Sequence, residues 1–362
     1  NIQMNKKIRW GILSTGSIAD SFVFGLRVCP DAEVAAVGSR TAAAAERFGV
    51  RHGIPRRHPS YEALAADPDV DVIYIGTPHN LHCENTLMCL EAGKPVLCEK
   101  PFALNAGQSE RMIALARSRG LFLMEAMWMR FIPAIRELRR LLSAGVIGDV
   151  GMMEADFGFP ARFDPHGRLF DPALGGGALL DLGIYPISLA YWLFGPPDRV
   201  ESLAVLGPTG VDEKSAALFG YKNGRLAVLH FTLVADAPSG AVIMGTRGRI
   251  RVHPPIYRPE RLSLILKDLS NQAPKPRPDR FRRFVRLPRL SPLRKTADEH
   301  RDPPLVFPLR GNGYNYEAEE VMRCLREGRL ESRDMPLDET LSIIRTLDRV
   351  RAPWGLRYPG ET

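Results

Sequence analysis

Residues 8–19 read Ile-Arg-Trp-Gly-Ile-Leu-Ser-Thr-Gly-Ser-Ile-Ala, and this stretch decides the fold. Its first part, Ile8–Leu13, is a short apolar run that predicts a buried strand. Its end leads into Ile18–Val28, where apolar residues recur with the spacing of a helix. Small residues in the pattern Ser14-x-Gly16-x-x-Ala19 join the two. A strand that enters a helix through such a turn is typical of the opening unit of an α/β fold.

Apolar runs and helical stretches alternate through the first third of the chain. Further strands are expected at Glu33–Gly38, Val70–Ile75, Val96–Cys98 and Leu121–Met124, with a short strand or turn at Arg56–Tyr61. The helices between them are expected at Ala42–Val50, Leu81–Ala92 and Asn105–Ser118. This alternation predicts a doubly wound parallel sheet of the Rossmann type.

The pattern changes near Met127, where successive strands replace the alternation. Helices are expected at Ile132–Ser143, Ala178–Leu193, Asn315–Glu327 and Leu337–Arg351. Strands are expected at Val150–Gly158, Arg199–Leu206, Ser215–Tyr221, Arg225–Val234, Gly240–Gly245, Arg249–Val252 and Arg261–Leu266. We therefore expect a nucleotide-binding domain at residues 1–126 and, at residues 127–362, an α+β domain with a large, mostly antiparallel sheet. The last helix, 337–351, is expected to pack back on the first domain.

The composition fits two globular domains. The chain has 362 residues, of which 45% are hydrophobic, and this is enough for two cores. No apolar run approaches the roughly 18–20 residues of a membrane span. No signal peptide is evident, and Asn1-Ile2-Gln3 precede the first methionine. We expect a cytoplasmic protein without a membrane partner.

The cysteines favour the same compartment. Their number is odd and none forms a CxxC pair: they are Cys29, Cys83, Cys89, Cys98 and Cys324. This pattern is typical of buried free thiols in a reducing compartment, and it predicts neither a disulfide framework nor a metal site.

The net charge of +8 is concentrated in one segment. Residues 271–305 contain ten Lys or Arg, four Asp or Glu and seven prolines. We interpret 268–305 as a basic, proline-rich insertion that forms a loop. The rest of the chain is close to neutral, so we expect no nucleic-acid partner.

The turn at Ser14-x-Gly16-x-x-Ala19 is a variant of the dinucleotide fingerprint G-x-G-x-x-G/A, with serine in place of the first glycine. Gly16 lets the backbone approach a pyrophosphate, and the helix that follows offers its N-terminal N–H groups. The cofactor is therefore expected to contact Ser14, Thr15, Gly16, Ser17 and Ile18.

The end of the second strand indicates which nucleotide binds. NAD sites place an acidic residue there for the ribose 2′-hydroxyl, whereas this chain has Gly38-Ser39-Arg40. The guanidinium of Arg40 and the hydroxyl of Ser39 suit a 2′-phosphate. We expect NADP; the alternative is that Arg40 is merely exposed and NAD also binds.

Two later segments follow strands that end at the same edge of the predicted sheet, where α/β proteins bind ligands. The first is Gly76-Thr77-Pro78-His79-Asn80, with His82 just inside the next helix. Its histidines are candidate acid–base groups, but we expect them to order the backbone or to contact the cofactor. The second is Glu99-Lys100-Pro101, a charged pair at the end of an apolar strand.

These motifs together resemble the Gfo/Idh/MocA family of oxidoreductases. The resemblance rests on the fingerprint, on Thr77-Pro78 with His82, and on Gly93-Lys94-Pro95 before Glu99-Lys100-Pro101. A closer similarity, to the branch of dimeric dihydrodiol dehydrogenases and NADP-dependent D-xylose dehydrogenases, rests on Glu125-Ala-Met-Trp128-Met-Arg130-Phe131-Ile-Pro133, on residues 168–185 from Arg168 through Gly175-Gly-Gly177 and Asp181 to Tyr185, and on Tyr314-Asn-Tyr316-Glu317. It covers nearly the whole chain except 268–305.

The resemblance implies that Lys100 lies beside the nicotinamide and the reacting carbon, where an ammonium can polarise a carbonyl. It implies that Tyr185 handles the proton, with Asp181 four residues before it on the same helix face. A tyrosine needs a nearby cation to ionise near neutral pH, and Lys100 is expected to supply it. The alternative is that Asp181 and Tyr185 form a buried hydrogen-bonded pair that holds the helix.

Further site residues follow from the same motifs. Trp128 and Arg130 are expected to shape the pocket for cofactor and substrate, and Phe159 and Arg168 to contact the substrate. Glu99 is expected to orient Lys100 or to be structural.

The leading hypothesis is an NADP-dependent dehydrogenase for the CH–OH group of a sugar or vicinal diol. One alternative is an enzyme that keeps NADP bound and recycles it internally, as glucose–fructose oxidoreductase does. Another is a non-catalytic NADP-sensing protein. We also expect a homodimer formed through the sheet of the second domain.

Overall fold

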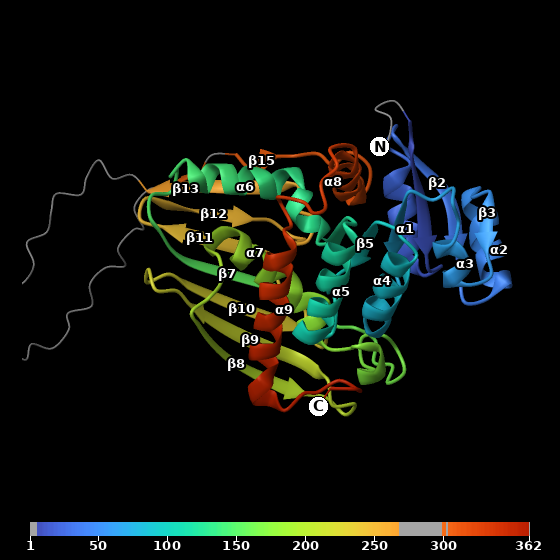
Figure 1. The fold of residues 1–362 in the computed structure, drawn as a ribbon. Helices are drawn as coiled ribbons and strands as arrows, with labels where there is room; N and C mark the ends of the chain where they lie inside the picture. Colours follow the sequence, from blue (N-terminus) through green and yellow to red (C-terminus); the bar gives the residue numbers. More distant parts are fainter. Residues whose placement is uncertain (1–5, 268–298, 302, 362) are drawn as a thin grey trace, which may run out of the picture.

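The computed structural model describes residues 6–267, 299–301 and 303–361, which form two sheets with their helices (Figure 1). Most of the expected basic insertion 268–305 lies outside the described residues. The predicted fold class, a Rossmann sheet followed by an α+β unit, is confirmed.

The first sheet is entirely parallel, with strand order β3-β2-β1-β4-β5-β6. Its strands are β1 (Ile8–Leu13), β2 (Ala32–Gly38), β3 (Arg56–His58), β4 (Val72–Ile75), β5 (Val96–Glu99) and β6 (Leu123–Ala126). Its helices are α1 (Ser17–Leu26), α2 (Ala42–His52), α3 (Tyr61–Ala65), α4 (His82–Glu91) and α5 (Ala106–Arg119). From β1 the chain adds strands first on one side of the sheet (β2, β3) and then on the other (β4, β5, β6). Such a switch point between β1 and β4 opens a ligand crevice at the carboxyl ends of the strands.

Helix α3 was not expected, because the segment before it was interpreted as a strand or turn. The side chain of Ser60 accepts a hydrogen bond from Ala63 N and so starts the helix directly after β3. The expected short strand is present as β3, and the cap, a local signal, ends the segment by starting a helix.

The second sheet has strand order β14-β13-β12-β11-β7-β10-β9-β8, and β15 pairs with β13. Its strands are β7 (Val150–Gly158), β8 (Arg199–Leu206), β9 (Asp212–Gly220), β10 (Leu226–Thr232), β11 (Ala241–Gly245), β12 (Gly248–Val252), β13 (Arg261–Lys267), β14 (Glu299–Arg301) and β15 (Leu305–Val306). Of the pairs, β7 with β10 is parallel and the others are antiparallel. Strands β14 and β15 were not predicted.

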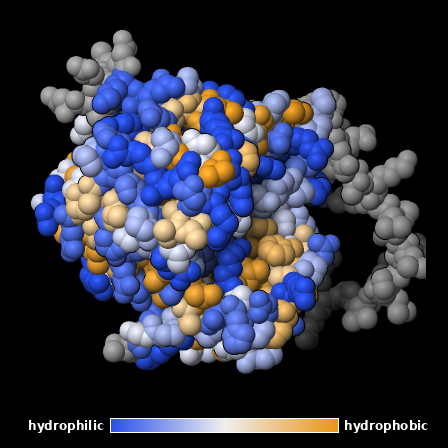
Figure 2. Space-filling view, turned by 90° about the vertical axis from the view of Figure 1, so that its right-hand side faces the viewer, coloured by the Kyte–Doolittle hydropathy of each residue, from blue (hydrophilic) through white to orange (hydrophobic). Residues whose placement is uncertain are grey.

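Helices α6 (Pro133–Ser143), α7 (Ile184–Phe194) and α9 (Leu337–Arg351) cover one face of the second sheet (Figure 1). Helix α8 (Tyr314–Arg326) instead packs against α1 of the first sheet. Helix α9 also contacts α5, where Asp348 accepts a hydrogen bond from Ala106 N at 2.8 Å and Arg345 pairs with Glu110 at 2.7 Å. The end of the chain therefore joins the two sheets. The end of the molecule that carries the first sheet is mostly hydrophilic (Figure 2).

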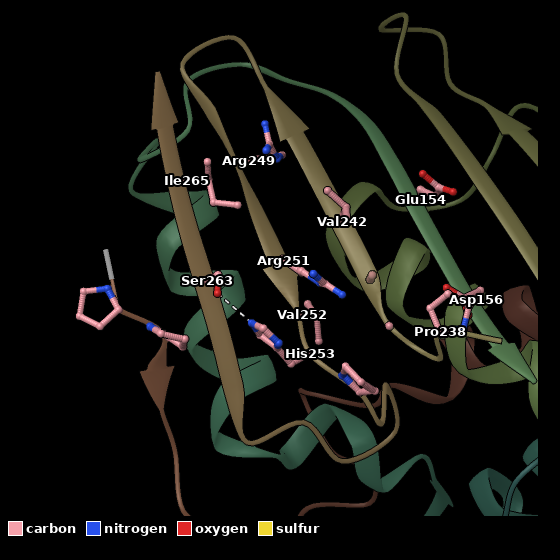
Figure 3. Close-up of a pocket in the computed structure, with 15 residues that line it drawn as sticks. Glu154, Asp156, Pro238, Val242, Arg249, Arg251, Val252, His253, Ser263 and Ile265 are labelled. Atoms are coloured by element: carbon pink, nitrogen blue, oxygen red, sulfur yellow. Dashed lines mark hydrogen bonds between the residues drawn. The ribbon is translucent and has the colours of Figure 1, made fainter. Parts of the chain in front are cut away.

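The other face of the second sheet carries exposed apolar side chains on β8, β9 and β10: Leu203, Val205, Leu218 and Leu226. Beside them lies a groove of about 730 Å³ (Figure 3). Register places Val242 of β11 between Glu154 of β7 and Arg251 of β12, so the groove carries charges of both signs.

One helical stretch, Pro172–Phe194, is long and apolar enough to cross a membrane by composition, which differs from our expectation that no such stretch exists. Of its most apolar window, 89% is buried inside the protein. It is a core helix, and the short helical turns η3 (Pro172–Leu174) and η4 (Leu179–Gly183) precede its regular part, α7. All five cysteines are buried and none forms a disulfide.

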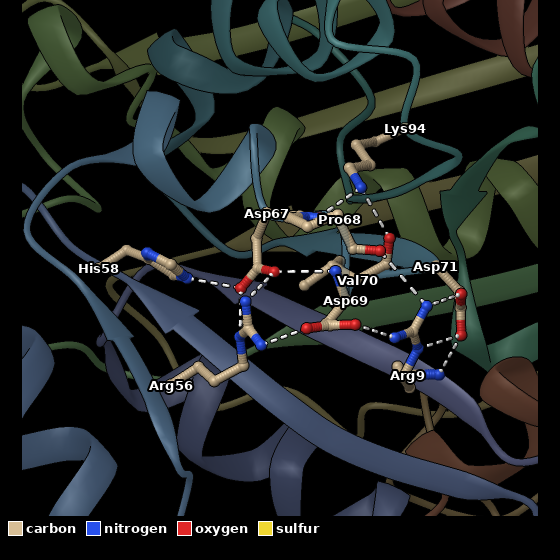
Figure 4. Close-up of polar contacts among 9 residues, drawn as sticks. All are labelled: Arg9, Arg56, His58, Asp67, Pro68, Asp69, Val70, Asp71 and Lys94. Atoms are coloured by element: carbon tan, nitrogen blue, oxygen red, sulfur yellow. Dashed lines mark hydrogen bonds and ion pairs between the residues drawn. The ribbon is translucent and has the colours of Figure 1, made fainter.

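A polar network ties together the amino-terminal edge of the first sheet, opposite the ligand edge (Figure 4). The Asp67 carboxylate is fully buried and binds Arg56 through both oxygens and His58 at 2.7 Å. Lys94 donates to the main-chain oxygens of Asp67 and Val70, at 2.6 and 2.8 Å. These bonds fix the loop that leads into β4.

Replacing Asp67 with asparagine is expected to lower the free energy of unfolding by about 2 kcal/mol at neutral pH, because charge-assisted hydrogen bonds to Arg56 and His58 are lost. Although burial acts to raise the pKa of Asp67, hydrogen bonds from Asp69 N, Arg56 and His58 lower it below its usual value. An acid with a lowered folded pKa stabilises above its unfolded pKa and loses that effect as the pH falls. The deficit of the variant should therefore shrink below about pH 4 in urea unfolding.

The matched control is Asp69→Asn. Asp69 also pairs with Arg56 but its side chain is 50% exposed, so its loss is expected to cost less than about 1 kcal/mol. Equal destabilisation by the two variants would contradict the assigned importance of the buried carboxylate.

Candidate active site

A cavity of about 250 Å³ lies at the carboxyl ends of β1, β4 and β5. It is lined by Ser14, Gly16, Ser17, Ile18, Gly76, Thr77, Pro78, His79, His82, Glu99, Lys100, Arg168, Leu174 and Asp181. The structure therefore brings most of the predicted cofactor and catalytic residues into one space. Leu174 is the lining residue that the sequence did not indicate.

The turn between β1 and α1 has the geometry of a phosphate-binding loop. Ser14 adopts a φ of +118°, a conformation that favours glycine, which explains why the fingerprint normally has glycine there. Its hydroxyl accepts a hydrogen bond from Gly16 N at 3.2 Å and so braces the turn. Helix α1 begins at Ser17 after Gly16, which provides no side-chain cap. The helix start is therefore suited to an anion.

The end of β2 lies beside this turn. Ser39 Oγ is 3.3 Å from Thr15 Oγ1, so the two hydroxyls link the loops that follow β1 and β2. Arg40 is exposed at the start of the next loop. Burial raises the pKa of the neighbouring Tyr61, and the Arg40 guanidinium opposes that rise. Hydroxyls and an exposed guanidinium without a carboxylate suit a phosphorylated ribose, and these residues fit NADP.

The loop after β4 contributes two buried histidines. His79 Nδ1 lies 2.9 Å from Gly175 O, and His82 lies 2.8 Å from Pro101 O and 2.9 Å from Thr77 O. Burial lowers the pKa of His79 to about 3 and that of His82 to about 4, so both rings are neutral at physiological pH. His82 thus connects the loop after β4 with the loop after β5. Asn80 lies in the short helical turn between the two histidines and does not line the cavity.

Lys100 follows β5 and reaches across the cavity. Its ammonium donates to Asp181 O at 2.9 Å and to Asp181 Oδ1 at 3.2 Å. Glu99, directly before it, is buried and binds away from the ammonium: it accepts from the Tyr74 hydroxyl at 2.7 Å and from Lys100 N at 3.1 Å. Glu99 therefore anchors the backbone that presents Lys100.

Asp181 is the acidic centre of the site. Its carboxylate accepts a hydrogen bond from Arg168 Nη1 at 2.7 Å, and His79 Nε2 lies 3.9 Å away. Burial acts to raise the pKa of Asp181, but Lys100 and Arg168 lower it well below its usual value. The carboxylate is ionised at any pH at which the protein works, and it balances the positive charge of Lys100 and Arg168.

The helix that carries Asp181 is not regular. Residues Leu179–Gly183 form a π-helical turn and α7 continues from Ile184. The predicted helix at Ala178–Leu193 is therefore present, but the geometry of four-residue spacing assumed for Asp181 and Tyr185 is altered. Such π turns are uncommon and occur often at functional sites.

Tyr185 lies in an aromatic cluster beside Lys100. Its hydroxyl accepts a hydrogen bond from Trp128 Nε1 at 2.9 Å, and Lys100 Nζ lies 4.8 Å from the centre of its ring. The cluster also contains Phe157, Tyr257 and Tyr314, of which Tyr314 stacks on Trp128 at 4.2 Å. Phe159, which is 36% exposed, extends the cluster from Phe157 toward solvent.

This arrangement does not favour the expected ionisation of Tyr185 by Lys100. The ammonium lies over the ring and not at the hydroxyl. Burial raises the pKa of Tyr185 well above its ordinary value, and the Glu99 carboxylate raises it further. Tyr185 therefore keeps its proton, and its oxygen accepts the hydrogen bond from Trp128; the residue is buried beside Lys100 and does not itself line the cavity.

The structure does not bring Arg130 into the cavity, where the sequence motif placed it. Its guanidinium is fully buried, donates to Ser188 Oγ at 3.0 Å and pairs with Glu339 at 2.7 Å. Arg130 instead connects α7 with α9. A motif position reports that a residue is constrained, and here the constraint is the ion pair of the buried Arg130 guanidinium with the partly exposed Glu339.

The sequence also missed members of the aromatic cluster. Phe157 lies near the end of β7, and Phe159 directly follows that strand, with the two ring centres 6.1 Å apart. Tyr257 lies in the loop between β12 and β13, and no periodic signal marks it.

The chain is similar to known proteins over nearly its full length. Residues 8–127 match the model of an oxidoreductase family with an NAD-binding Rossmann fold, and residues 135–251 match the model of the GFO/IDH/MocA C-terminal domain. Trans-1,2-dihydrobenzene-1,2-diol dehydrogenase of Xenopus tropicalis is 38% identical over 355 residues, which are 97% of this chain and 99% of the relative. The enzyme of the same name from Homo sapiens is 36% identical over 358 residues, 98% of this chain and 99% of the relative.

A solved structure is similar over the same length. KijD10, a 3-ketoreductase from Actinomadura kijaniata in complex with NADP and TDP-benzene, superposes with a TM-score of 0.78 at 28% identity. The match covers 96% of this chain and 98% of that one.

Proposed function

Because this chain belongs to the Gfo/Idh/MocA family of oxidoreductases, we propose that it transfers a hydride between NADP and the carbinol or carbonyl carbon of a sugar or vicinal diol. The observation that carries this proposal is the position of Lys100. Its ammonium is held by Asp181 in a cavity that also contains the fingerprint turn, and Tyr185 lies against it.

A bound nicotinamide would supply or accept the hydride. In the direction of reduction, the Lys100 ammonium polarises the carbonyl oxygen and stabilises the negative charge that grows on it. The Tyr185 hydroxyl then donates the proton that completes the alcohol. Oxidation is the reverse of these steps, so the proton of the substrate hydroxyl returns to the Tyr185 oxygen while Lys100 stabilises the negative charge on the substrate oxygen. Asp181 and Trp128 hold Lys100 and Tyr185 in place.

The experiment that tests this function mixes the protein and NADP with each member of a panel of aldoses and trans-diols. Turnover is monitored through the absorbance of the NADPH that forms. We expect turnover of at least one member that depends on NADP. Protein that retains stoichiometric nucleotide through dialysis and turns over only with a second sugar would favour internal recycling. Tight NADP binding without turnover of any member would favour the NADP-sensing protein.

The preference for NADP is proposed to depend on Arg40. Replacing Arg40 with alanine is expected to raise the Kd for NADP by about 30-fold and to change the Kd for NAD by less than about threefold, since only the 2′-phosphate loses a partner. Isothermal titration of both nucleotides measures the two constants. Arg47→Ala, an exposed arginine on α2, is the control and should change neither. An equal loss of affinity for NADP and NAD would contradict the role assigned to Arg40.

We also propose that the open face of the second sheet pairs two copies of the chain. The exposed Leu203, Val205 and Leu218 lie there beside a groove of mixed charge, and such a face is costly to leave in water. Light scattering should give the mass of a dimer, and Leu203→Glu should shift it to that of a monomer. A monomeric wild type at working concentration would contradict the proposal.

A further inference from the structure

The helical stretch that carries Asp181 and Tyr185 has no cap of its own. It begins directly after Gly177, and Ala178 makes no side-chain hydrogen bond to its first turn. A carboxylate from the second sheet supplies one: Asp212 Oδ2, at the start of β9, accepts a hydrogen bond from Leu179 N at 2.8 Å. The first turn of the catalytic helix is thus attached to the sheet two residues before Asp181.

The backbone before the helix leaves space for the Asp212 side chain. Gly177 has a φ of +118°, and a Cβ at that position would collide with Asp212 Oδ1. The Tyr358 hydroxyl donates to Gly176 O at 2.7 Å, and His79 Nδ1 binds Gly175 O at 2.9 Å. Three elements therefore hold the three glycines, and Asp212 is the one that contacts the helix itself.

Asp212 has few other partners. It is fully buried, Ser215 Oγ donates to Oδ2 at 2.7 Å, and Oδ1 has no hydrogen-bond partner among the described residues. The charged or titratable groups that face it are Arg351 of α9 and Tyr358 near the end of the chain. Burial raises the pKa of Asp212 to about 7, against the opposing effects of Ser215, Leu179 N and Arg351. Near neutral pH the carboxyl therefore exists in both forms, and the ionised form is the stronger acceptor at a helix N-terminus.

We propose that Asp212 is a positioning residue, which holds the start of the helical stretch 178–194 and thereby sets where Asp181 and Tyr185 stand relative to Lys100. The effect on turnover rests on the proposed function. The effect on the helix does not, because it is a property of the fold.

The test compares wild type, Asp212→Asn and Asp212→Ala in kcat, KM, NADP affinity and amide hydrogen exchange. The asparagine keeps an acceptor for Leu179 N but not the charge. We expect its kcat to be about fivefold lower than wild type at about pH 8 and nearly equal at about pH 6, where wild type is also neutral. The alanine variant should lose about 30-fold in kcat at both pH values. NADP affinity should stay within about twofold, since the nucleotide is expected to bind the first sheet.

Two controls separate positioning from general loss of stability. Asp67→Asn removes a buried carboxylate at the opposite edge of the first sheet and should leave kcat unchanged despite lower stability. Ser215→Ala removes a hydrogen bond that lowers the pKa of Asp212, so it should move the rise of kcat with pH to higher pH.

Hydrogen exchange of residues 178–185 gives a readout without substrate. We expect it to be about tenfold faster in Asp212→Asn than in wild type at about pH 8. If no substrate of the panel is turned over, the proposed function fails but this measurement still decides the role of Asp212. If Asp212→Ala does not fold, the asparagine variant carries the test. If Asp212→Asn had the same kcat, pH profile and exchange rates as the wild type, the inference would be overturned.

Discussion

Replacing Lys100 with methionine is expected to lower kcat by about three orders of magnitude while the Kd for NADP changes by less than about threefold. Methionine fills similar space but offers no charge to the substrate oxygen, so the charge that develops there is left without its partner. The nucleotide keeps its contacts with the fingerprint turn. Stopped-flow turnover and fluorescence titration with NADPH measure the two quantities separately.

The fold should survive this substitution, because Asp181 keeps its 2.7 Å bond from Arg168. Lys222→Met is the matched control: its side chain is 89% exposed, and the variant should equal wild type in both measurements. Full activity of the Lys100 variant on a substrate of the wild type would exclude Lys100 as the electrophilic group.

Replacing Tyr185 with phenylalanine is expected to lower kcat by about two orders of magnitude, the usual contribution of a positioned general acid. The Trp128 indole N–H also loses its acceptor, which should lower the free energy of unfolding by about 1–2 kcal/mol. The pKa of Tyr185 lies well above its ordinary value. The rate of reduction by the wild type should therefore not fall around neutral pH through deprotonation of Tyr185.

Tyr191→Phe separates the two effects in this experiment. Tyr191 is buried on the same helix, and its hydroxyl bonds to Thr346 Oγ1 at 2.6 Å, away from the cavity. This variant should lose similar stability and keep its kcat. Equal kcat values for the two variants would mean that Tyr185 has a structural role alone, as the hydrogen-bonded alternative holds.

The sequence predicted the parts of this site that depend on the order of elements. Lys100, the fingerprint turn and the loop that starts at Gly76 each follow a strand of a parallel sheet, so their meeting at one edge follows from the topology. The helix that carries Asp181 and Tyr185 was also predicted, as an apolar stretch. That this helix lies opposite Lys100 was implied only by the family resemblance.

The sequence could not predict what depends on side-chain packing. The π turn at Leu179–Gly183 is shaped by tertiary contacts, Asp212 among them, and local propensity does not report these. The protonated state of Tyr185 follows from burial and from Glu99, two features that only the folded chain creates. Arg130 shows the opposite error: its motif predicted a pocket residue, whereas its buried guanidinium binds Ser188 of α7 and Glu339 of α9.

The return of the chain's end to the first sheet has a bearing on how this protein is made. Helix α8 covers α1, α9 covers α5, and Leu123 N of the edge strand β6 donates to Leu330 O at 3.1 Å. The nucleotide-binding half therefore lacks part of its own surface layer until α8 and α9 have been synthesised. Its early translation product should stay open and prone to proteolysis or chaperone capture, and it should close only when these two helices have emerged.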